Sequence, residues 1–265
     1  AALELNEYFQ VVLKNFDAST LESEHVSYVI RGNNGNETLL GDDADNTISG
    51  EIGHDTIEGD GGDDTLNGGA GNDTVSGGKG NDQLWGGGGS DTLFGNEGND
   101  KLSAEGGNDQ LDGGAGDDLL VADIGNNTLT GGSGKDTFKV GDYEKYGSQN
   151  SQYHNTVTDF EIDNDSVEIT HALDSLSLHH LDDDGIYSVS DFFSQVGNDV
   201  LIEGSRRASV TLENVNLADL NGDQFHFTLI GRNNADHIVG GDGNDTLIGR
   251  KGNDTLEGGA GNDWL

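Results

Sequence analysis

Apolar residues recur in this chain at one position of a nine-residue unit, and glycine and acidic residues fill the positions between them. The unit follows itself without insertion twelve times from Gly32 to Lys139 and four more times from Gly231 to Leu265. It reads G-G-x-G-x-D-x-U-x, where U is a large aliphatic or aromatic residue, and this eighth position is apolar in all sixteen units. A fixed period of this kind predicts a repeating structure rather than a flexible glycine-rich linker.

The unit predicts an alternation of tight turns and very short strands. The glycines of G-G-x-G-x-D tolerate positive φ, whereas x-U-x suits a short strand. Two units then make one 18-residue coil with a strand on each face, and the eighth-position side chains point inward from both faces. Stacked coils pair their strands in parallel, and a right-handed path is expected for such crossovers. The predicted fold class is therefore all-β, a right-handed parallel β-roll (β-solenoid).

Acidic residues occupy the sixth position of nearly every unit. This position is aspartate in thirteen of the sixteen units, and the exceptions are Glu37, Asn46 and Asn127. In a stack of 18-residue coils, aspartates eighteen residues apart lie one above another along the same edge. One edge carries Asp55, Asp73, Asp91 and Asp109, and the other carries Asp64, Asp82, Asp100, Asp118 and Asp136.

These columns predict calcium sites. Each column brings like-charged carboxylates within one coil spacing, and the bent turns also aim backbone carbonyl oxygens at the same point. A hard cation with six or more oxygen ligands relieves the repulsion, and calcium suits such a site better than magnesium, which tends to keep its waters. Aspartates that only solvate the surface would not need a fixed spacing of nine. Counting the eligible stacks predicts about 8–12 Ca²⁺ ions, with weak or empty sites near the first coil and near Asn127.

The predicted ligands are the sixth-position side chains and the turn glycines. The side-chain ligands are Asp55, Asp64, Asp73, Asp82, Asp91, Asp100, Asp109, Asp118, Asp136, Asp236, Asp245, Asp254 and Asp263, with Asn46 and Asn127. The backbone ligands are Gly53, Gly62, Gly69, Gly71, Gly78, Gly80, Gly87, Gly89, Gly98, Gly107, Gly114, Gly116, Gly241, Gly243, Gly252, Gly259 and Gly261.

Units such as residues 68–76, GGAGNDTVS, and residues 240–248, GGDGNDTLI, match a known calcium-binding nonapeptide closely. On these units the chain resembles the RTX (repeats-in-toxin) family. The resemblance implies a parallel β-roll with calcium between successive turns. It also implies a bacterial protein that a type I secretion system exports, and hence a secreted, extracellular or cell-surface location.

The composition of the chain indicates which classes of ligand and partner it can bind. The chain has 12 Lys and Arg against 50 Asp and Glu, a formal charge of −38, which disfavours nucleic acid and the surface of anionic membranes and favours small cations. It has no cysteine, so disulfides and cysteine-based zinc sites are excluded. No apolar run approaches eighteen residues and the start is not rich in Lys or Arg, so neither a membrane span nor a signal peptide is predicted. Because the chain begins without Met and stops within a repeat, we expect a fragment of a longer protein.

Four domains are predicted: an N-terminal cap (1–31), a first roll (32–139), a β-rich capping segment (140–230) and a second roll (231–265). Val26, Tyr28 and Ile30 are expected to alternate into the first coil. Ninth-position Trp85, Phe94 and Val121 should face outward, either packed beneath a cap or forming a docking patch. In the capping segment, strands are expected at 157–162, 167–169, 200–202, 208–212 and 225–230, and short helices around 190–193, with Ser190 as N-cap, and 217–220.

No catalytic motif is found: H-E-x-x-H, G-x-S-x-G and P-loop sequences are absent, and the histidines are scattered. His179-His180 beside Asp182-Asp183-Asp184 is either a solvated loop or a transition-metal site. The leading interpretation is a non-catalytic calcium-binding module that folds on extracellular calcium and supports type I secretion and stability of a larger protein. The alternatives are a calcium-dependent adhesion or surface-layer module that touches anionic polysaccharide, and the C-terminal part of a secreted protease, lipase, epimerase or toxin.

Overall fold

A computed structural model describes residues 9–10, 29–140, 153–172, 187–188, 192–203 and 208–265. The chain divides into two compact units, Ala1–Gly134 and Lys135–Leu265. In the described residues the regular secondary structure is β-strand and short 3-10 helix, with no α-helix. The prediction of an all-β fold is confirmed.

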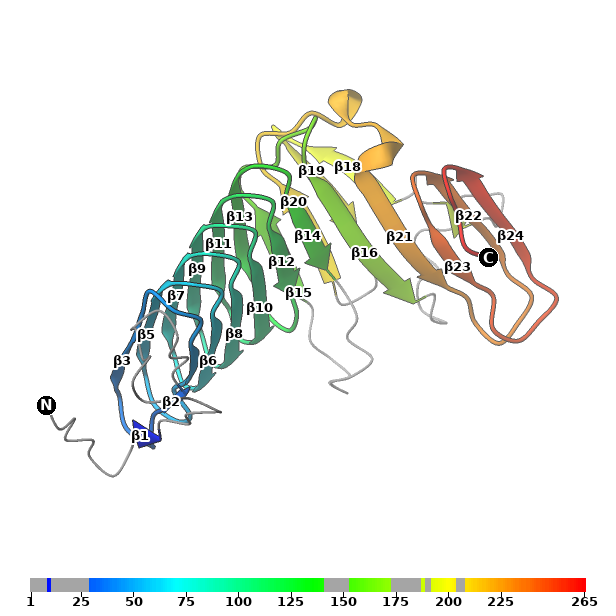
Figure 1. The fold of residues 1–265 in the computed structure, drawn as a ribbon. Coiled ribbons are helices and arrows are strands. Elements are labelled where there is room, and N and C mark those ends of the chain that lie inside the picture. Colours follow the sequence, from blue (N-terminus) through cyan, green and yellow to red (C-terminus); the bar gives the residue numbers. More distant parts are fainter. Residues whose placement is uncertain (1–8, 11–28, 141–152, 173–186, 189–191, 204–207) are drawn as a thin grey trace, which may run out of the picture. The chain divides into compact units, whose positions relative to one another are not determined.

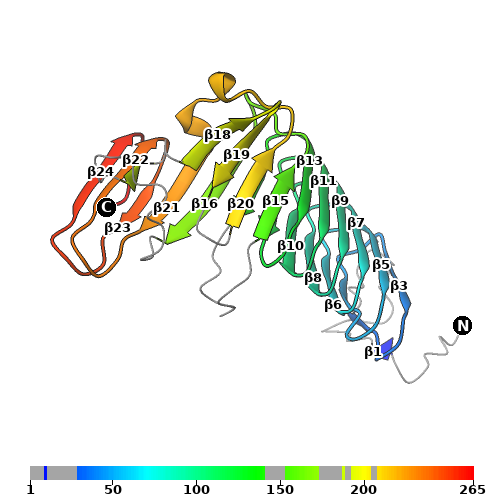
Figure 2. The same cartoon turned by 180° about the vertical axis from the view of Figure 1, so that it is seen from behind.

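The first unit consists of stacked coils that build two parallel sheets, because successive strands alternate between the sheets (Figure 1). The first sheet has the order β1-β2-β4-β6-β8-β10-β12, in which β1 pairs antiparallel to β2 and the rest are parallel. Its strands are β1 (Phe9–Gln10), β2 (Val29–Arg31), β4 (Thr47–Ser49), β6 (Thr65–Ala70), β8 (Gln83–Gly88), β10 (Lys101–Gly106) and β12 (Leu119–Ala122). The second sheet, seen from the opposite side in Figure 2, contains β3 (Thr38–Asp42), β5 (Thr56–Gly61), β7 (Thr74–Lys79), β9 (Thr92–Glu97), β11 (Gln110–Ala115) and β13 (Thr128–Ser133), in this order.

The register of both sheets repeats every eighteen residues. Leu84 pairs with Leu66 on one side and with Leu102 on the other, and Val75 pairs with Ile57 and Leu93 in the second sheet. The structure therefore confirms the 18-residue coil and the stacking of coils in parallel.

The strands are longer than the sequence pattern predicts. Strand β6 runs through Gly68 and Gly69 to Ala70, so it covers the x-U-x of one unit and the first three positions of the next. The reason is that the parallel ladder continues through the glycines, where Gly69 pairs with Gly87. The tight turn is confined to the fourth to sixth positions.

The core is a double row of eighth-position side chains, as predicted. Fourteen of the sixteen are buried, from Leu39 and Ile48 to Leu247, whereas Leu256 is half-buried and Leu265 is exposed in the last coil. The three large ninth-position residues lie outside the core row: Trp85 and Val121 are half-buried and Phe94 is 37% exposed. At the other end, Ile30 is buried as predicted, and Val26 and Tyr28 lie outside the described residues.

The second unit continues the parallel pairing with less regular spacing. One sheet has the order β14 (Thr137–Val140), β16 (Ser166–Ala172), β21 (Phe225–Ile230) and β23 (Thr246–Ile248). A second has the order β15 (Tyr153–Val157), β20 (Ala208–Leu212), β19 (Asp199–Glu203) and β18 (Phe193–Val196), in which the last two pairings are antiparallel. A third contains β17 (Tyr187–Ser188), β22 (His237–Asp242) and β24 (Thr255–Ala260).

An aromatic cluster fills the interior of this unit. Phe225 packs edge-on against Phe193 with ring centroids 4.9 Å apart and is stacked with Phe160 at 6.3 Å. Aromatic pairs at these separations add packing energy beyond their buried area. The larger side chains fill the interior where the coils no longer follow the nine-residue period.

The predictions for the capping segment are confirmed in part. Residues 167–169, 200–202, 208–212 and 225–230 lie in β16, β19, β20 and β21. The strand expected at 157–162 is wrong beyond Val157, because the chain turns and Glu161 accepts hydrogen bonds from Asn164 and Asp165. The helix expected around 190–193 is wrong at Phe193, which begins strand β18 and pairs with Ile202 of β19. Ser190 lies outside the described residues. Leu217–Asp219 forms a 3-10 helix (η5) capped by Asn216, and a second 3-10 helix (η6) spans Gly222–Gln224.

Candidate metal centre

The sixth-position aspartates of the first unit form two hydrogen-bonded columns, as their spacing predicts. The backbone N–H of Asp55 donates to Oδ1 of Asp73 at 2.8 Å, and the N–H of Asp73 donates to Oδ1 of Asp91 at 2.8 Å. The other edge repeats this link from Asp64 to Asp82 at 2.8 Å and from Asp82 to Asp100 at 2.7 Å. Each carboxylate thus uses one oxygen to hold the coil beneath it.

The second carboxylate oxygen is buried and unsatisfied. In the part of the chain that the structure describes, one set of Oδ2 atoms is shielded from solvent and has no hydrogen-bond partner. These atoms belong to Asp55, Asp64, Asp73, Asp82, Asp91, Asp100, Asp109 and Asp245. A buried charged oxygen without a hydrogen-bond donor is strongly unfavourable, so each of these Oδ2 atoms requires a bound cation or a proton.

Glycine at the first position of the unit leaves a space beside this oxygen. An ideal Cβ placed on Gly68 would lie 2.6 Å from Oδ2 of Asp73 and 2.7 Å from the carbonyl oxygen of Gly86 in the next coil. A Cβ on Gly86 would lie 2.6 Å from Oδ2 of Asp91 and 3.0 Å from the carbonyl oxygen of Ala104. A carboxylate oxygen and a carbonyl oxygen from consecutive coils therefore border one small space.

Carbonyls of first-position residues were not among the ligands that the motif predicts. The signal is present in the sequence, because this position is Gly or Ala in all sixteen units. It indicates a position that tolerates almost no side chain, and the structure gives the reason.

The predicted backbone ligands lie in the turns, and all have positive φ. The fourth-position group is Gly53, Gly62, Gly71, Gly80, Gly89, Gly98, Gly107, Gly116, Gly243, Gly252 and Gly261, and the second-position group is Gly69, Gly78, Gly87, Gly114, Gly241 and Gly259. At Gly71 (φ 141°) a Cβ would collide with the carbonyl oxygen of Gly53 one coil below, so only glycine fits there. Their role as ligands stays a prediction.

The donor set is one of oxygens, and most of it is backbone. Among the described residues no group of three or more His, Cys, Asp or Glu side chains converges on one point. A cation beside Oδ2 would therefore take carboxylate oxygens from the column and complete its shell with turn carbonyls. Calcium accepts such mixed, irregular oxygen shells, so the residues fit calcium.

Burial also shifts the titration of the columns. Desolvation raises the pKa of Asp64 and Asp109 to about 7, and that of Asp91 and Asp100 to about 6, against an ordinary value of 3.8. Hydrogen bonds from backbone N–H groups oppose this shift, and neighbouring carboxylates add to it. Without a cation, the folded columns thus take up protons at a higher pH than free aspartates do.

At the ends of the columns, the sixth-position residue or its hydrogen-bond partner differs from that of the interior coils. Oε2 of Glu37 accepts from the backbone N–H of Asn33 at 3.0 Å, and Asn46 and Asn127 place a neutral amide where other units have a carboxylate. In the second unit, the backbone N–H of Asp136 donates to Oδ1 of Asp165 at 3.0 Å, and Oδ2 of Asp165 accepts from Glu161 at 2.8 Å. Asp165 is outside the nine-residue period, but Asp165-Ser166-Val167 repeats the D-x-U pattern, which is the signal that could have found it.

The second array keeps the same links. The N–H of Phe227 donates to Oδ1 of Asp245 at 2.9 Å, and the N–H of Asp245 donates to Oδ1 of Asp263 at 3.0 Å. Desolvation raises the pKa of Asp245 to about 6. Asp254 accepts from the N–H of Asp236 at 3.0 Å, and both oxygens of Asp236 have partners in Arg232.

A second ladder runs along the outside of the turns and was not predicted. The side chain at the fifth position accepts a hydrogen bond from the backbone of the next coil: Asp63 Oδ1 from Asn81 at 2.7 Å, and His54 Nδ1 from Asn72 at 2.7 Å. Fourteen of the sixteen units carry Asn, Asp, His or Ser here, which was a readable signal. His179 and His180 lie outside the described residues.

Comparison with known families agrees with this geometry. The RTX calcium-binding nonapeptide repeat family matches residues 31–66, 50–84, 58–93, 85–120, 112–142 and 230–265, which together make up more than half of the chain. The chain belongs to this family. The resemblance read from the repeat is therefore confirmed, and with it calcium as the ion that this class of repeat binds.

Two solved structures match this chain at low similarity. The AlgE6R3 subunit of the Azotobacter vinelandii mannuronan C5-epimerase is 24% identical over 56% of this chain and 78% of that chain, with a TM-score of 0.26. The extracellular lipase LipA from Serratia marcescens is 18% identical over 79% of this chain and 41% of that chain, with a TM-score of 0.19. No curated protein sequence matches this chain. In the residues that the structure describes, no helix has the length and apolarity needed to cross a bilayer.

Filling the space beside Oδ2 should weaken calcium binding. Gly68→Val places a branched side chain, larger than the alanine found at this position in two units, against Oδ2 of Asp73 and the Gly86 carbonyl oxygen, so we expect a several-fold higher calcium midpoint for folding. Gly88→Val is the matched control, because Gly88 is exposed and a Cβ there meets nothing within 4 Å. Calcium titrations followed by circular dichroism check this, and equal midpoints for the two variants would contradict the assignment of the space.

Acidification should favour the roll when calcium is absent. The aspartate pKa values are raised in the folded state to about 6 or 7 from 3.8, so the folded chain binds more protons than the unfolded chain between these values. Their contribution to stability is complete below pH about 4 and is lost as the pH rises through about 6–7. In calcium-free buffer the β-signal of circular dichroism should rise from pH 8 to pH 5. The rise should be smaller in an Asp64→Asn/Asp109→Asn variant, and a signal that stays flat or falls would contradict the prediction.

Proposed function

We propose that this chain is a non-catalytic RTX module that folds when it meets extracellular calcium and thereby supports type I secretion and the stability of a larger exported bacterial protein. The observation that carries the proposal is the repeated buried Oδ2 atom without a hydrogen-bond partner, beside a carbonyl oxygen of the next coil. The family match supports calcium as the ion, and the predicted number of about 8–12 ions follows from the stacks.

Calcium binding and folding are one event in this proposal. The ligands come from consecutive coils, so they converge only when the coils have stacked, and the formal charge of −38 opposes stacking in the absence of cations. With dissociation constants of about 10⁻⁴–10⁻³ M, each ion contributes roughly 1.4–2.7 kcal/mol at about 10 mM calcium. At micromolar calcium the same relation gives almost nothing for each site.

This dependence separates the two sides of the bacterial envelope. At the low calcium concentration of a cytoplasm the chain stays unfolded and highly charged, which is the state that a narrow export channel accepts. At the higher concentration outside the cell the coils close on calcium, and the folded module protects the exported protein. The module itself needs no catalytic residue for this role.

The proposal can be tested by removing the charge of one column aspartate and, as a control, the charge of one exposed glutamate. Asp91→Asn keeps an acceptor for the N–H of Asp73 but removes the charged ligand, so the calcium midpoint for folding should rise several-fold. Glu58→Gln removes the same charge from an exposed ninth position of β5 and should leave the midpoint unchanged. Circular dichroism with calcium and with EDTA reads both variants and the wild type. A wild-type β-signal equally strong in EDTA would overturn the proposed function.

A further inference from the structure

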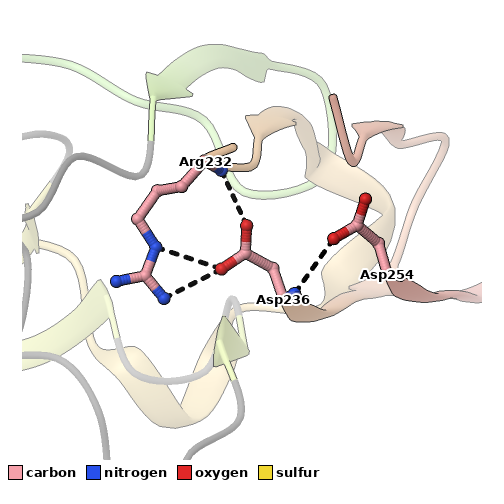
Figure 3. Close-up of polar contacts among 3 residues, drawn as sticks. All are labelled: Arg232, Asp236 and Asp254. Carbon is pink, nitrogen blue, oxygen red and sulfur yellow. Dashed lines mark hydrogen bonds and ion pairs between the residues drawn. The ribbon is translucent and has the colours of Figure 1, made fainter. Parts of the chain in front are cut away.

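In one unit of the second array, a basic side chain forms an ion pair with the sixth-position carboxylate of the same unit. Arg232 occupies the second position of the unit that begins at Gly231, where the repeat pattern has glycine, and Asp236 is the sixth-position residue of that unit. The guanidinium group lies against the carboxylate, with Nε 3.0 Å and Nη2 2.8 Å from Oδ1 of Asp236 (Figure 3). The backbone N–H of Arg232 donates to Oδ2 of Asp236 at 2.7 Å.

The pair is enclosed by the roll. The side chain of Asp236 is 0% exposed and that of Arg232 is 24% exposed. Asp236 still belongs to its column, because its backbone N–H donates to Oδ1 of Asp254 at 3.0 Å (Figure 3). The guanidinium group therefore meets a carboxylate that stands in the ordinary position of a sixth-position ligand.

The next unit shows which contacts a sixth-position aspartate makes when its second-position residue is glycine. Asp245 follows nine residues later and has one oxygen bound to the N–H of Phe227, while its Oδ2 is buried and has no hydrogen-bond partner. The second position of that unit is Gly241, which brings no charge. Asp236 has neither an unsatisfied oxygen nor an uncompensated charge, so it lacks the two features that indicate a calcium site at Asp245.

We propose that the Arg232 guanidinium takes the place of calcium at Asp236. The corner at Asp236, by which we mean the turn that holds this sixth-position carboxylate, is then neutralised without metal. This inference rests on the proposed function for the other corners. A guanidinium stays protonated at all accessible pH values and offers two parallel donors, so it neutralises a carboxylate independently of the calcium concentration. The sequence prediction of Asp236 as a calcium ligand is accordingly replaced at this one position.

The consequence is an order of folding within the second array. The corner at Asp236 is compensated before any ion binds, and its link to Asp254 already joins two coils. Calcium then has to supply only the corners at Asp245 and beyond. Arg232 is thus a positioning residue that prepares the array for calcium.

The test counts bound calcium ions by native mass spectrometry of the whole chain at saturating calcium, with calcium alone as the probe. Asp236→Asn should leave the number of ions unchanged, whereas Asp245→Asn should lower it by at least one. Arg232→Ala should raise the number by one, because the backbone N–H keeps one oxygen of Asp236 and the other loses its donors. Arg31→Ala is the control: it removes an arginine from the exposed ion pair with Glu51 and should not change the number.

The outcomes separate this inference from the proposed function. A lower number of ions in Asp236→Asn would show that Asp236 binds calcium and would overturn the role of Arg232, while a loss in Asp245→Asn would leave the proposed function standing. An unchanged number in Arg232→Ala would also overturn it. If Arg232→Ala does not fold, the Asp236→Asn and Asp245→Asn pair decides alone. A wild type that binds no calcium would overturn the proposed function and this inference together.

Discussion

A buried carboxylate oxygen without a hydrogen-bond donor is the feature on which the roll depends. In each interior coil, one oxygen of the sixth-position aspartate accepts the N–H of the aspartate one coil away, and the other oxygen is left in a desolvated corner. Desolvation raises the pKa of these aspartates toward neutrality, which shows how unfavourable the bare charge is in this place. In the proposed function, a calcium ion bound between coils neutralises these carboxylates and stabilises the stacking of the coils. Where a corner has another solution, as at Asp165 with its two backbone donors or at Asp236 with Arg232, the same requirement is met by the chain itself.

The close approach of the coils is the second constraint. Each coil buries one large apolar side chain on either face, such as Leu84 and Leu93, and most of its other buried side chains are the sixth-position aspartates. Glycines such as Gly68 and Gly71 keep the corner open for oxygens and let consecutive turns lie in contact. A fold with so small a core has little hydrophobic stabilisation for its length, and the proposed function therefore assigns the main stabilising contribution to calcium at the turns.

Much of this architecture is predictable, because a period is a strong signal. The 18-residue coil, the inward row from Leu39 to Leu247 and the columns through Asp73 and Asp82 follow from the spacing alone. The length of the strands does not, since the ladder continues through Gly69 by pairing with a glycine of the next coil. The sequence carries a signal for the first-position residues and for Asp165, but their partners do not follow from the period. These contacts depend on the distance between coils and on a 29-residue step between Asp136 and Asp165. Arg232 was a visible departure from glycine, and only its geometry shows that it compensates Asp236.

Hydrogen–deuterium exchange of the first roll, followed by mass spectrometry with calcium and after its removal, tests the central claim most directly. The amides of Asp73 and Asp91 and the ladder amides of β5 to β11 are hydrogen-bonded only when the coils are stacked. The account predicts strong protection across residues 56–115 with calcium, and exchange at unfolded-chain rates throughout this range once calcium is removed at pH 8. Protection that persists across this range without calcium would contradict it.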